Sequence, residues 1–244
     1  MRILIAAPPK AGNSWLKCLL GHMYGLTWLR GDETPATTEP EDYAAWVAAG
    51  KFPDGTIFHH HYDCSPAFCD AVEATPAHLV TIVRDPYDSF VSLYHFVQAQ
   101  AAAAGSGDRD RREKKRQSSI VGKPIDDPAV LDFLRNSFAS VLDKAIAWAE
   151  SDRTAVVRYE GLHDDPQAEL RRVAARLGPV DDERIAAAIA ACDADAMRRD
   201  RPGMSKRIRS ATVGDWRNHL TDAHLQLFRD EYAPRIERLG YPVQ

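Results

Sequence analysis

The chain has 244 residues, with 31 lysine and arginine against 35 aspartate and glutamate residues, so its formal net charge is −4. Hydrophobic residues make up 45% and charged residues 27%, which is typical of a globular protein. No stretch approaches the roughly 18–20 uninterrupted apolar residues of a membrane span. The slightly acidic balance also argues against a basic protein that binds nucleic acid.

The first part of the chain predicts strands that alternate with helices. Strands are expected at 2–7, 56–62 and 78–84, and helices at 14–26, 41–49, 66–74 and from 86 onward. Pro8 and Pro9 end the first strand, and Asp85 and Pro86 suit the cap and the first position of a helix. This alternation is typical of a parallel sheet flanked by helices.

The second part continues the same pattern after an interruption. Residues 101–127 are rich in alanine, glycine and serine and then in charge, so we expect a mobile surface segment there. Further elements are expected as a helix at 128–150, a strand at 154–160, and helices at 166–177, 182–192 and 223–239. The sequence therefore predicts one α/β domain over 1–244, with a central, mainly parallel sheet and helices on both faces.

The four cysteines, Cys18, Cys64, Cys69 and Cys192, follow no CxxC pattern. The apolar run at 3–7 is ended by prolines well short of the core of a signal peptide, so we expect none. We therefore expect a cytoplasmic protein with all four cysteines as thiols.

The turn between the first strand and the first helix has the composition of an anion site. Residues 8–15 read PPKAGNSW, and a glycine-containing turn of this kind presents backbone N–H groups and the positive end of a helix dipole. Lys10 adds a charge, and Asn13 and Ser14 add donors. The lysine precedes Gly12, so the spacing differs from the nucleoside-triphosphate motif GxxxxGK[ST]. A tight turn with a surface lysine is the simpler alternative.

Four segments carry a family resemblance. Residues 9–15, PKAGNSW, resemble the PKSGTTW loop of the sulfotransferases that use 3′-phosphoadenosine 5′-phosphosulfate (PAPS). In the family's order, 82–96 (IVRDPYDSFVSLYHF) resembles its 3′-phosphate segment, 157–166 (VRYEGLHDDP) its YEDL–DP segment, and 213–221 (VGDWRNHLT) the end of RKGxxGDWKN. Residues 30–55 and 97–150 show no such likeness.

The resemblance implies a set of ligands for the donor nucleotide. Its members are Lys10, Ala11, Gly12, Asn13, Ser14, Trp15, Arg84, Ser92, Tyr159, Arg209, Ser210 and Ala211. Lys10 is expected to stabilise charge on the departing phosphate, residues 12–14 to bind the 5′-phosphate, and Arg84 with Ser92 to bind the 3′-phosphate. Trp15 and Tyr159 are expected to contact adenine.

The implied reaction transfers a sulfuryl group from PAPS to a hydroxyl of a small molecule, leaves PAP, and needs no metal. A small-molecule kinase with a degenerate phosphate loop is the rival enzyme class. A nucleotide-binding module without catalysis is the rival outside enzymes.

The sequence departs from the family pattern in two places. The family's R-K-G becomes Arg209-Ser210-Ala211, so the lysine charge is lost and the glycine backbone is in question. Lys206 or Arg207 is a candidate to compensate. The family's dimer signature, roughly KxxxTVxxxE, has Asp222 in place of valine, which argues against that dimer contact because interface cores are depleted in charge. The oligomeric state stays open.

The general base is expected among three consecutive histidines on the second long strand. Aligning the family's K-[ST]-H with 59–61 makes His61 the first candidate and places His59 at the lysine. Residues two apart on a strand share a face, so both would reach the site while His60 points away. A structural histidine pair is one alternative, and a zinc site is another, formed by His59, His61, Asp63, Cys64 and Cys69.

The run 108–116, DRDRREKKR, is either a solvated loop or a lid that closes over an acceptor. Its local charge of +3 would weakly favour an acidic or phosphate-bearing acceptor.

Overall fold

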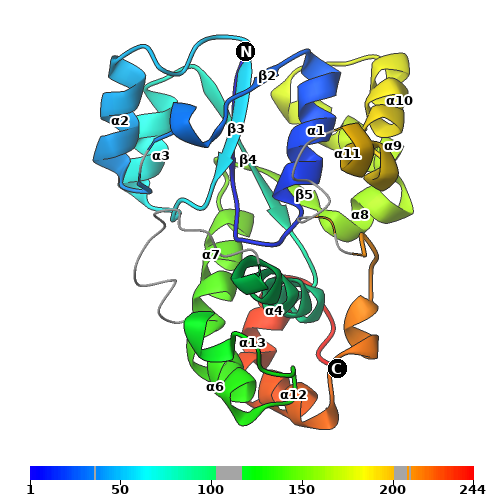
Figure 1. Ribbon diagram of the computed structural model, residues 1–244. Helices are drawn as coiled ribbons and strands as arrows, with labels where there is room; N and C mark the ends of the chain where they lie inside the picture. The colour runs from blue at the N-terminus through cyan, green and yellow to red at the C-terminus, as the bar shows by residue number, and fades with distance from the viewer. Residues whose placement is uncertain (36, 103–116, 201–207, 209) are drawn as a thin grey trace. The chain divides into compact units, whose positions relative to one another are not determined.

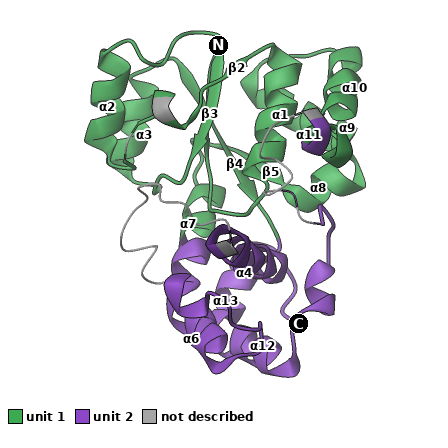
Figure 2. Ribbon diagram, viewed as in Figure 1, with its two compact units in different colours: residues 1–84, 144–197 green, residues 85–143, 198–244 purple. Residues whose placement is uncertain are grey.

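The computed structural model describes residues 1–244 apart from 36, 103–116, 201–207 and 209 (Figure 1). The chain divides into two compact units, each made of two segments (Figure 2). The first contains 1–84 and 144–197, and the second contains 85–143 and 198–244. We describe each unit by itself.

The first unit is built on a five-stranded parallel sheet. Its strands are β1 (Arg2–Ala6), β2 (Thr27–Trp28), β3 (Thr56–His60), β4 (Ala77–Val83) and β5 (Ala155–Arg158). Their order is β2-β3-β1-β4-β5, and every neighbouring pair is parallel. Residues 3–7 have no exposed surface, as expected for the central strand of a sheet covered on both faces. The structure confirms the predicted α/β class.

Helices cover both faces of this sheet. They are α1 (Asn13–Tyr24), α2 (Pro40–Ala48), α3 (Pro66–Glu73), α8 (Tyr159–Asp164), α9 (Pro166–Leu177) and α10 (Asp182–Ala191), with parts of α7 (Ala139–Ala149) and α11 (Ala194–Asp200) and the short 3₁₀ turn η1 (Gly31–Glu33). The crossovers β1-α1-β2 and β3-α3-β4 run in opposite directions across the sheet. Since such crossovers are right-handed, α1 and α3 lie on opposite faces, as Figure 1 shows.

An aromatic core holds the chain where it leaves β3. Its large rings are Tyr43, Trp46, Phe52, Phe58, Tyr62, Phe68 and Trp148, all less than a tenth exposed. Tyr62 stacks on Phe68 with ring centroids 4.1 Å apart, and the Trp148 indole N–H donates to the Tyr62 carbonyl at 2.9 Å. These contacts fix the backbone that follows the three histidines.

The second unit is helical in the residues described. It contains α4 (Pro86–Ala102), η2 (Ser118–Ile120), α6 (Pro128–Ser137), the start of α7, η3 (Asp215–Asn218), α12 (Asp222–Leu227), the π-helical turn η4 (Phe228–Tyr232) and α13 (Ala233–Arg238). Phe138 lies 5.5 Å from Phe90 and 6.0 Å from Phe228, measured between ring centroids. All three rings are fully buried, and they form the centre of this unit.

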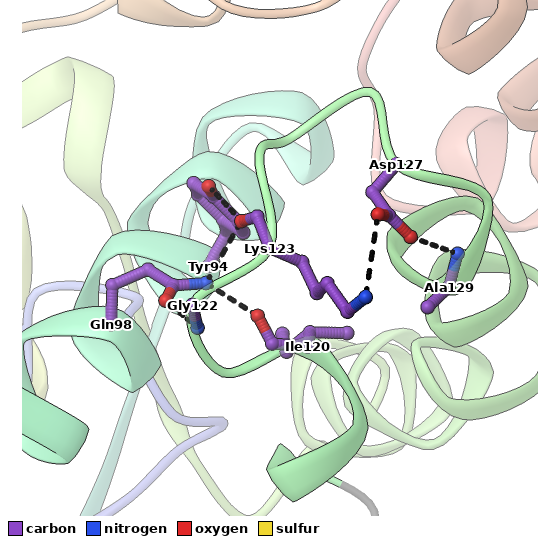
Figure 3. A network of polar contacts seen from close by, with 7 residues as sticks. All are labelled: Tyr94, Gln98, Ile120, Gly122, Lys123, Asp127 and Ala129. Atoms are coloured by element: carbon purple, nitrogen blue, oxygen red, sulfur yellow. Dashed lines mark hydrogen bonds and ion pairs between the residues drawn. The ribbon is translucent and has the colours of Figure 1, made fainter.

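Residues 117–127 pack against α4 (Figure 3). The Gln98 side chain donates to the Ile120 carbonyl and accepts from the Gly122 N–H, both at 2.7 Å, and the Tyr94 hydroxyl donates to the Lys123 carbonyl at 2.7 Å. Ile120 is fully buried. This part of the segment expected at 101–127 is therefore tied to a helix, while 103–116, with the basic run 108–116, lie outside the described residues.

Two predicted helices are divided in the structure. The helix expected at 128–150 is interrupted at Phe138, and beside the break the Ser140 hydroxyl donates to the Ser137 carbonyl at 3.1 Å. The helix expected at 223–239 passes through the π turn η4 before Pro234, which lacks the N–H that a continuous helix would need.

The cysteine prediction is wrong for one pair. Cys18 on α1 and Cys192 after α10 form a disulfide across 174 residues, with Cα atoms 5.8 Å apart. Packing of α10 on α1 brings the two residues together, which no CxxC spacing could reveal. Cys64 and Cys69 remain thiols, as expected.

Of the helices that the structure describes, none combines the length and the apolar character needed to cross a membrane.

Candidate active site

The loop from β1 to α1 is shaped by two residues with positive φ. Lys10 has φ 67° and Gly12, the cap of α1, has φ 110°. A Cβ on Gly12 would lie 2.7 Å from the Tyr159 ring, so both the backbone and the close approach require glycine. The Asn13 amide donates to the Pro8 carbonyl at 2.8 Å and closes the loop. No acidic residue occupies the first turn of α1, so its positive end suits an anion.

Aromatic and cationic side chains gather beside this loop. Trp15 on α1 contacts Tyr159 and His163, with ring centroids 5.5 and 4.9 Å away. The Arg84 guanidinium lies 4.2 Å from the centroid of the Tyr159 ring. Val83 pairs with Arg158 in the sheet, so Arg84 and Tyr159 both leave carboxyl ends of neighbouring strands. The structure thus brings together Lys10, Gly12, Trp15, Arg84 and Tyr159, all from the first unit.

The three histidines follow the carboxyl end of β3. The His61 Nδ1 lies 2.8 Å from the Ala7 carbonyl oxygen. Because that oxygen only accepts, Nδ1 carries the proton and Nε2 keeps a lone pair. The His59 ring lies 6.2 Å from the His61 ring, while the His60 ring packs on Tyr62 at 5.0 Å. His61 follows the last strand residue, so its position comes from the Ala7 contact as well as from the strand.

The charge state of His61 is determined by its surroundings. Burial lowers its pKa to about 4, and the charges of His60, Lys144 and Lys10 lower it as well. The hydrogen bond to Ala7 acts in the opposite direction and raises the pKa. Burial and Lys144 also lower the pKa of His60. His61 is therefore neutral at physiological pH and able to accept a proton at Nε2.

Lys144 on α7 supports the histidine segment, although no sequence pattern pointed to it. Its ammonium group donates to the His61 carbonyl and forms an ion pair with Asp63 at 2.8 Å. Trp148 lies one helical turn later and binds the next carbonyl, that of Tyr62. His163 was missed as well. The sequence predicted a strand through residue 160, whereas α8 begins at Tyr159 and brings His163 one helical turn later onto the same face.

The second unit holds the other expected ligands. Ser92 is half-buried on α4, Ser210 donates to Asp215 at 3.5 Å, and Arg209 lies outside the described residues. Ala211 has φ 55°, a left-handed conformation that favours glycine and costs alanine about 1–2 kcal/mol. The backbone there adopts a glycine-like conformation although the glycine is absent.

Asp88 connects two of the sequence blocks within this unit. Its carboxylate is buried and accepts from the Gly214 N–H at 2.7 Å and from the Trp216 N–H at 2.9 Å. It therefore ties the start of α4 to η3. Sequence reasoning did not select it.

The alternative zinc set does not converge. Among the described residues, the group of three or more possible ligands that meets at one point is Cys18, His22 and Cys192. His59, His61, Asp63, Cys64 and Cys69 form no such group.

Comparisons with known proteins identify the family of the chain. The family described as "Sulfotransferase domain" matches residues 1–240. Human sulfotransferase 2B1 is 24% identical over 266 residues, covering 99% of this chain and 67% of the relative. Cytosolic sulfotransferase 3 of Arabidopsis thaliana is 25% identical over 252 residues, covering 90% of this chain and 71% of the relative.

Solved structures share the fold. Mouse sulfotransferase SULT7A1 complexed with PAP superposes with a TM-score of 0.68 at 19% identity, covering 97% of this chain and 84% of that one. Retinol dehydratase with androsterone and the inactive cofactor PAP gives a TM-score of 0.58 at 13% identity, covering 97% and 80%. These likenesses confirm the predicted architecture.

Proposed function

The chain belongs to the sulfotransferase domain family, and from this premise we propose that it transfers a sulfuryl group from PAPS to a hydroxyl of a small molecule. The observation that carries the proposal is the glycine-capped loop at the start of α1, with Lys10 beside it and Arg84 stacked on Tyr159. The solved relatives named above hold PAP, the desulfated donor, which supports this choice of nucleotide.

The 5′ end of the donor is assigned to the loop. Backbone N–H groups at the start of α1, with Asn13 and Ser14, bind the 5′-phosphate, and Ala11 and Gly12 shape the turn. Lys10 offsets the charge that develops on the bridging oxygen as the sulfuryl group departs. A single group that stabilises developing charge in this way typically raises the reaction rate by about 10²–10³-fold.

The other end of the donor is assigned to the cationic and aromatic group. Arg84 binds the 3′-phosphate with its planar fork, and Trp15 and Tyr159 contact adenine. The roles of Ser92, Arg209, Ser210 and Ala211 rest on the sequence resemblance alone.

His61 is assigned as the general base. Its Nε2 takes the proton of the acceptor hydroxyl while that oxygen forms a bond to sulfur and the bond from sulfur to the 5′-phosphate oxygen breaks. The hydrogen bond from Nδ1 to Ala7 holds the required tautomer. His59, whose ring lies beside it, is the second candidate. No step in this scheme requires a metal.

We also propose that residues 1–244 act as one catalytic domain and that the protein works in the cytoplasm. Curated relatives carry the name cytosolic sulfotransferase, which supports this compartment.

Thermal unfolding with PAP or with ATP and magnesium tests the donor assignment. At 100 times its Kd, PAP should stabilise the fold by about 2.7 kcal/mol, which raises Tm by roughly 5–10 °C for a chain of this size. Arg84→Gln should reduce this shift. A larger shift with ATP and magnesium would contradict the proposal. Release of PAP from PAPS in the presence of a panel of hydroxyl compounds then tests transfer itself.

A further inference from the structure

Three side chains of the types that ligate metals meet outside the residues assigned to the donor. Cys18 and His22 lie four residues apart on α1 and so share one face of the helix. Cys192 is the cap residue directly after α10. The two sulfur atoms and one ring nitrogen of His22 all lie within 4.8 Å of one another.

The chemistry of this group fits a thiophilic cation. Two thiolates and one imidazole are the ligands that Zn²⁺ takes in many sites, and histidine four residues after a cysteine on a helix is a suitable spacing. Cys18 and Cys192 are fully buried, whereas His22 is exposed. The group is therefore shielded from solvent on the cysteine side and open to it on the histidine side.

The electrostatic surroundings also favour a cation. Cys192 stands at the C-terminal end of α10, where its N–H bonds the carbonyls of Ala188 and Ile189. The C-terminal end of a helix carries partial negative charge and stabilises a positive ion. His22 lies in the last turn of α1, so a second helix end contributes in the same sense.

We infer that Cys18, Cys192 and His22 bind Zn²⁺ or a similar divalent cation when the disulfide is reduced. A dithiol reductant supplies two electrons and two protons: its two thiols become a disulfide, and the Cys18–Cys192 bond becomes two thiols. Metal binding then releases one proton from each thiol. The disulfide and the metal are thus alternative ways to link α1 to α10, and the redox state selects between them.

Cobalt titration tests the site directly. The full-length protein, reduced with a phosphine and freed of metal, should bind one Co²⁺ and show a sulfur-to-cobalt charge-transfer band that Zn²⁺ removes. The oxidised protein should show no band. His22→Ala should weaken Co²⁺ binding about tenfold or more. Loss of a residue that merely hydrogen-bonds a metal ligand already lowers metal affinity by about that factor, and loss of a ligand should lower it at least as much.

Cysteine variants provide the controls. Cys192→Ser should abolish the band, while the matched Cys64→Ser/Cys69→Ser variant, which removes the other two thiols, should keep it. Circular dichroism and the Tm with PAP check that each variant is folded. A reduced wild type without a band, a band that survives Cys192→Ser, or unchanged affinity in His22→Ala would each overturn the inference.

Discussion

His61 shows how one hydrogen bond can determine the chemistry of a side chain. The Ala7 carbonyl fixes its tautomer, and burial keeps it neutral. Neither effect is visible in the sequence, where His59, His60 and His61 are equivalent in kind. Alignment to the family and strand periodicity ranked them, and the tautomer came only from the structure.

Replacing His61 tests the assignment of the base. Asparagine at this position retains an N–H for the Ala7 carbonyl but has no basic nitrogen. His61→Asn should lower kcat by roughly 10²–10⁴ and leave the Kd for PAP unchanged, because the base acts on the acceptor. Transfer assays and PAP titrations measure the two effects. Wild-type turnover in His61→Asn would instead favour His59 as the general base, and His59→Asn is the matched variant.

The pH dependence of stability reports the burial of His61. Its pKa is lowered from 6.5 to about 4 in the folded protein, so the unfolded chain takes up this proton first as the pH falls. The stabilising contribution is present above pH 6.5 and is lost between pH 6.5 and 4. The free energy of unfolding of wild type should therefore fall more steeply over this window than that of His61→Asn, as measured by urea titration at several pH values. Parallel curves would contradict it.

At the scale of elements, most strands and helices lie where the sequence predicts them. The strands predicted at 2–7, 56–62 and 78–84 match β1, β3 and β4 within two residues at each end, because each contains the β-branched and aliphatic residues that strands favour. The two-residue strand β2 was not predicted, since it is too short for periodicity to register. The breaks at Phe138 and before Pro234 depend on local hydrogen bonds and on packing.

The site also combines residues that sequence motifs predicted with residues that only the structure revealed. The loop, Arg84 and Tyr159 stand directly after strands, so their sequence motifs placed them on the correct edge of the sheet. Lys144, His163 and Asp88 act through contacts between helices and distant loops, which single-sequence patterns do not encode.

Asp88 offers a test of how α4 and η3 are connected. Asp88→Ala removes the acceptor of the Gly214 and Trp216 N–H groups, and buried groups left without partners cost about 1–3 kcal/mol. Urea unfolding should show a loss of this size, and hydrogen exchange at these two amides should accelerate. Asp132→Ala, at an exposed carboxylate on α6, should change stability by less than about 0.5 kcal/mol. Equal effects of the two substitutions would contradict the prediction.

At the scale of the whole molecule, the net charge of −4 does not tell where the positive side chains lie. Lys10 and Arg84 both stand at carboxyl ends of strands in the first unit, where the sheet presents its loops. Bulk composition therefore excluded a basic polymer-binding protein without excluding an anionic nucleotide.

The disulfide should contribute to global stability. It links residues 174 apart and so restricts the unfolded chain, an effect typically worth about 2–4 kcal/mol. With a metal chelator present, the free energy of unfolding of the oxidised wild type should exceed that of Cys18→Ala/Cys192→Ala by this amount, as measured by denaturant unfolding. Part of the loss in that variant comes from two shortened buried side chains, so reduced wild type is the second reference. Equal stability of oxidised and reduced wild type would contradict the prediction.

The two units are interleaved along the chain, since each combines an earlier and a later segment. During synthesis, the first unit cannot complete its sheet until β5 has been made, nor its disulfide until Cys192 has been made. Both are synthesised only after residues 85–143 of the second unit. The second unit likewise cannot complete its fold until residues 198–244 have been made. A protease that cuts once at any of the three crossings between them, at 84/85, 143/144 or 197/198, leaves at least one unit made of pieces from both fragments. A single nick can therefore yield two chains that stay associated, and neither fragment contains two complete units.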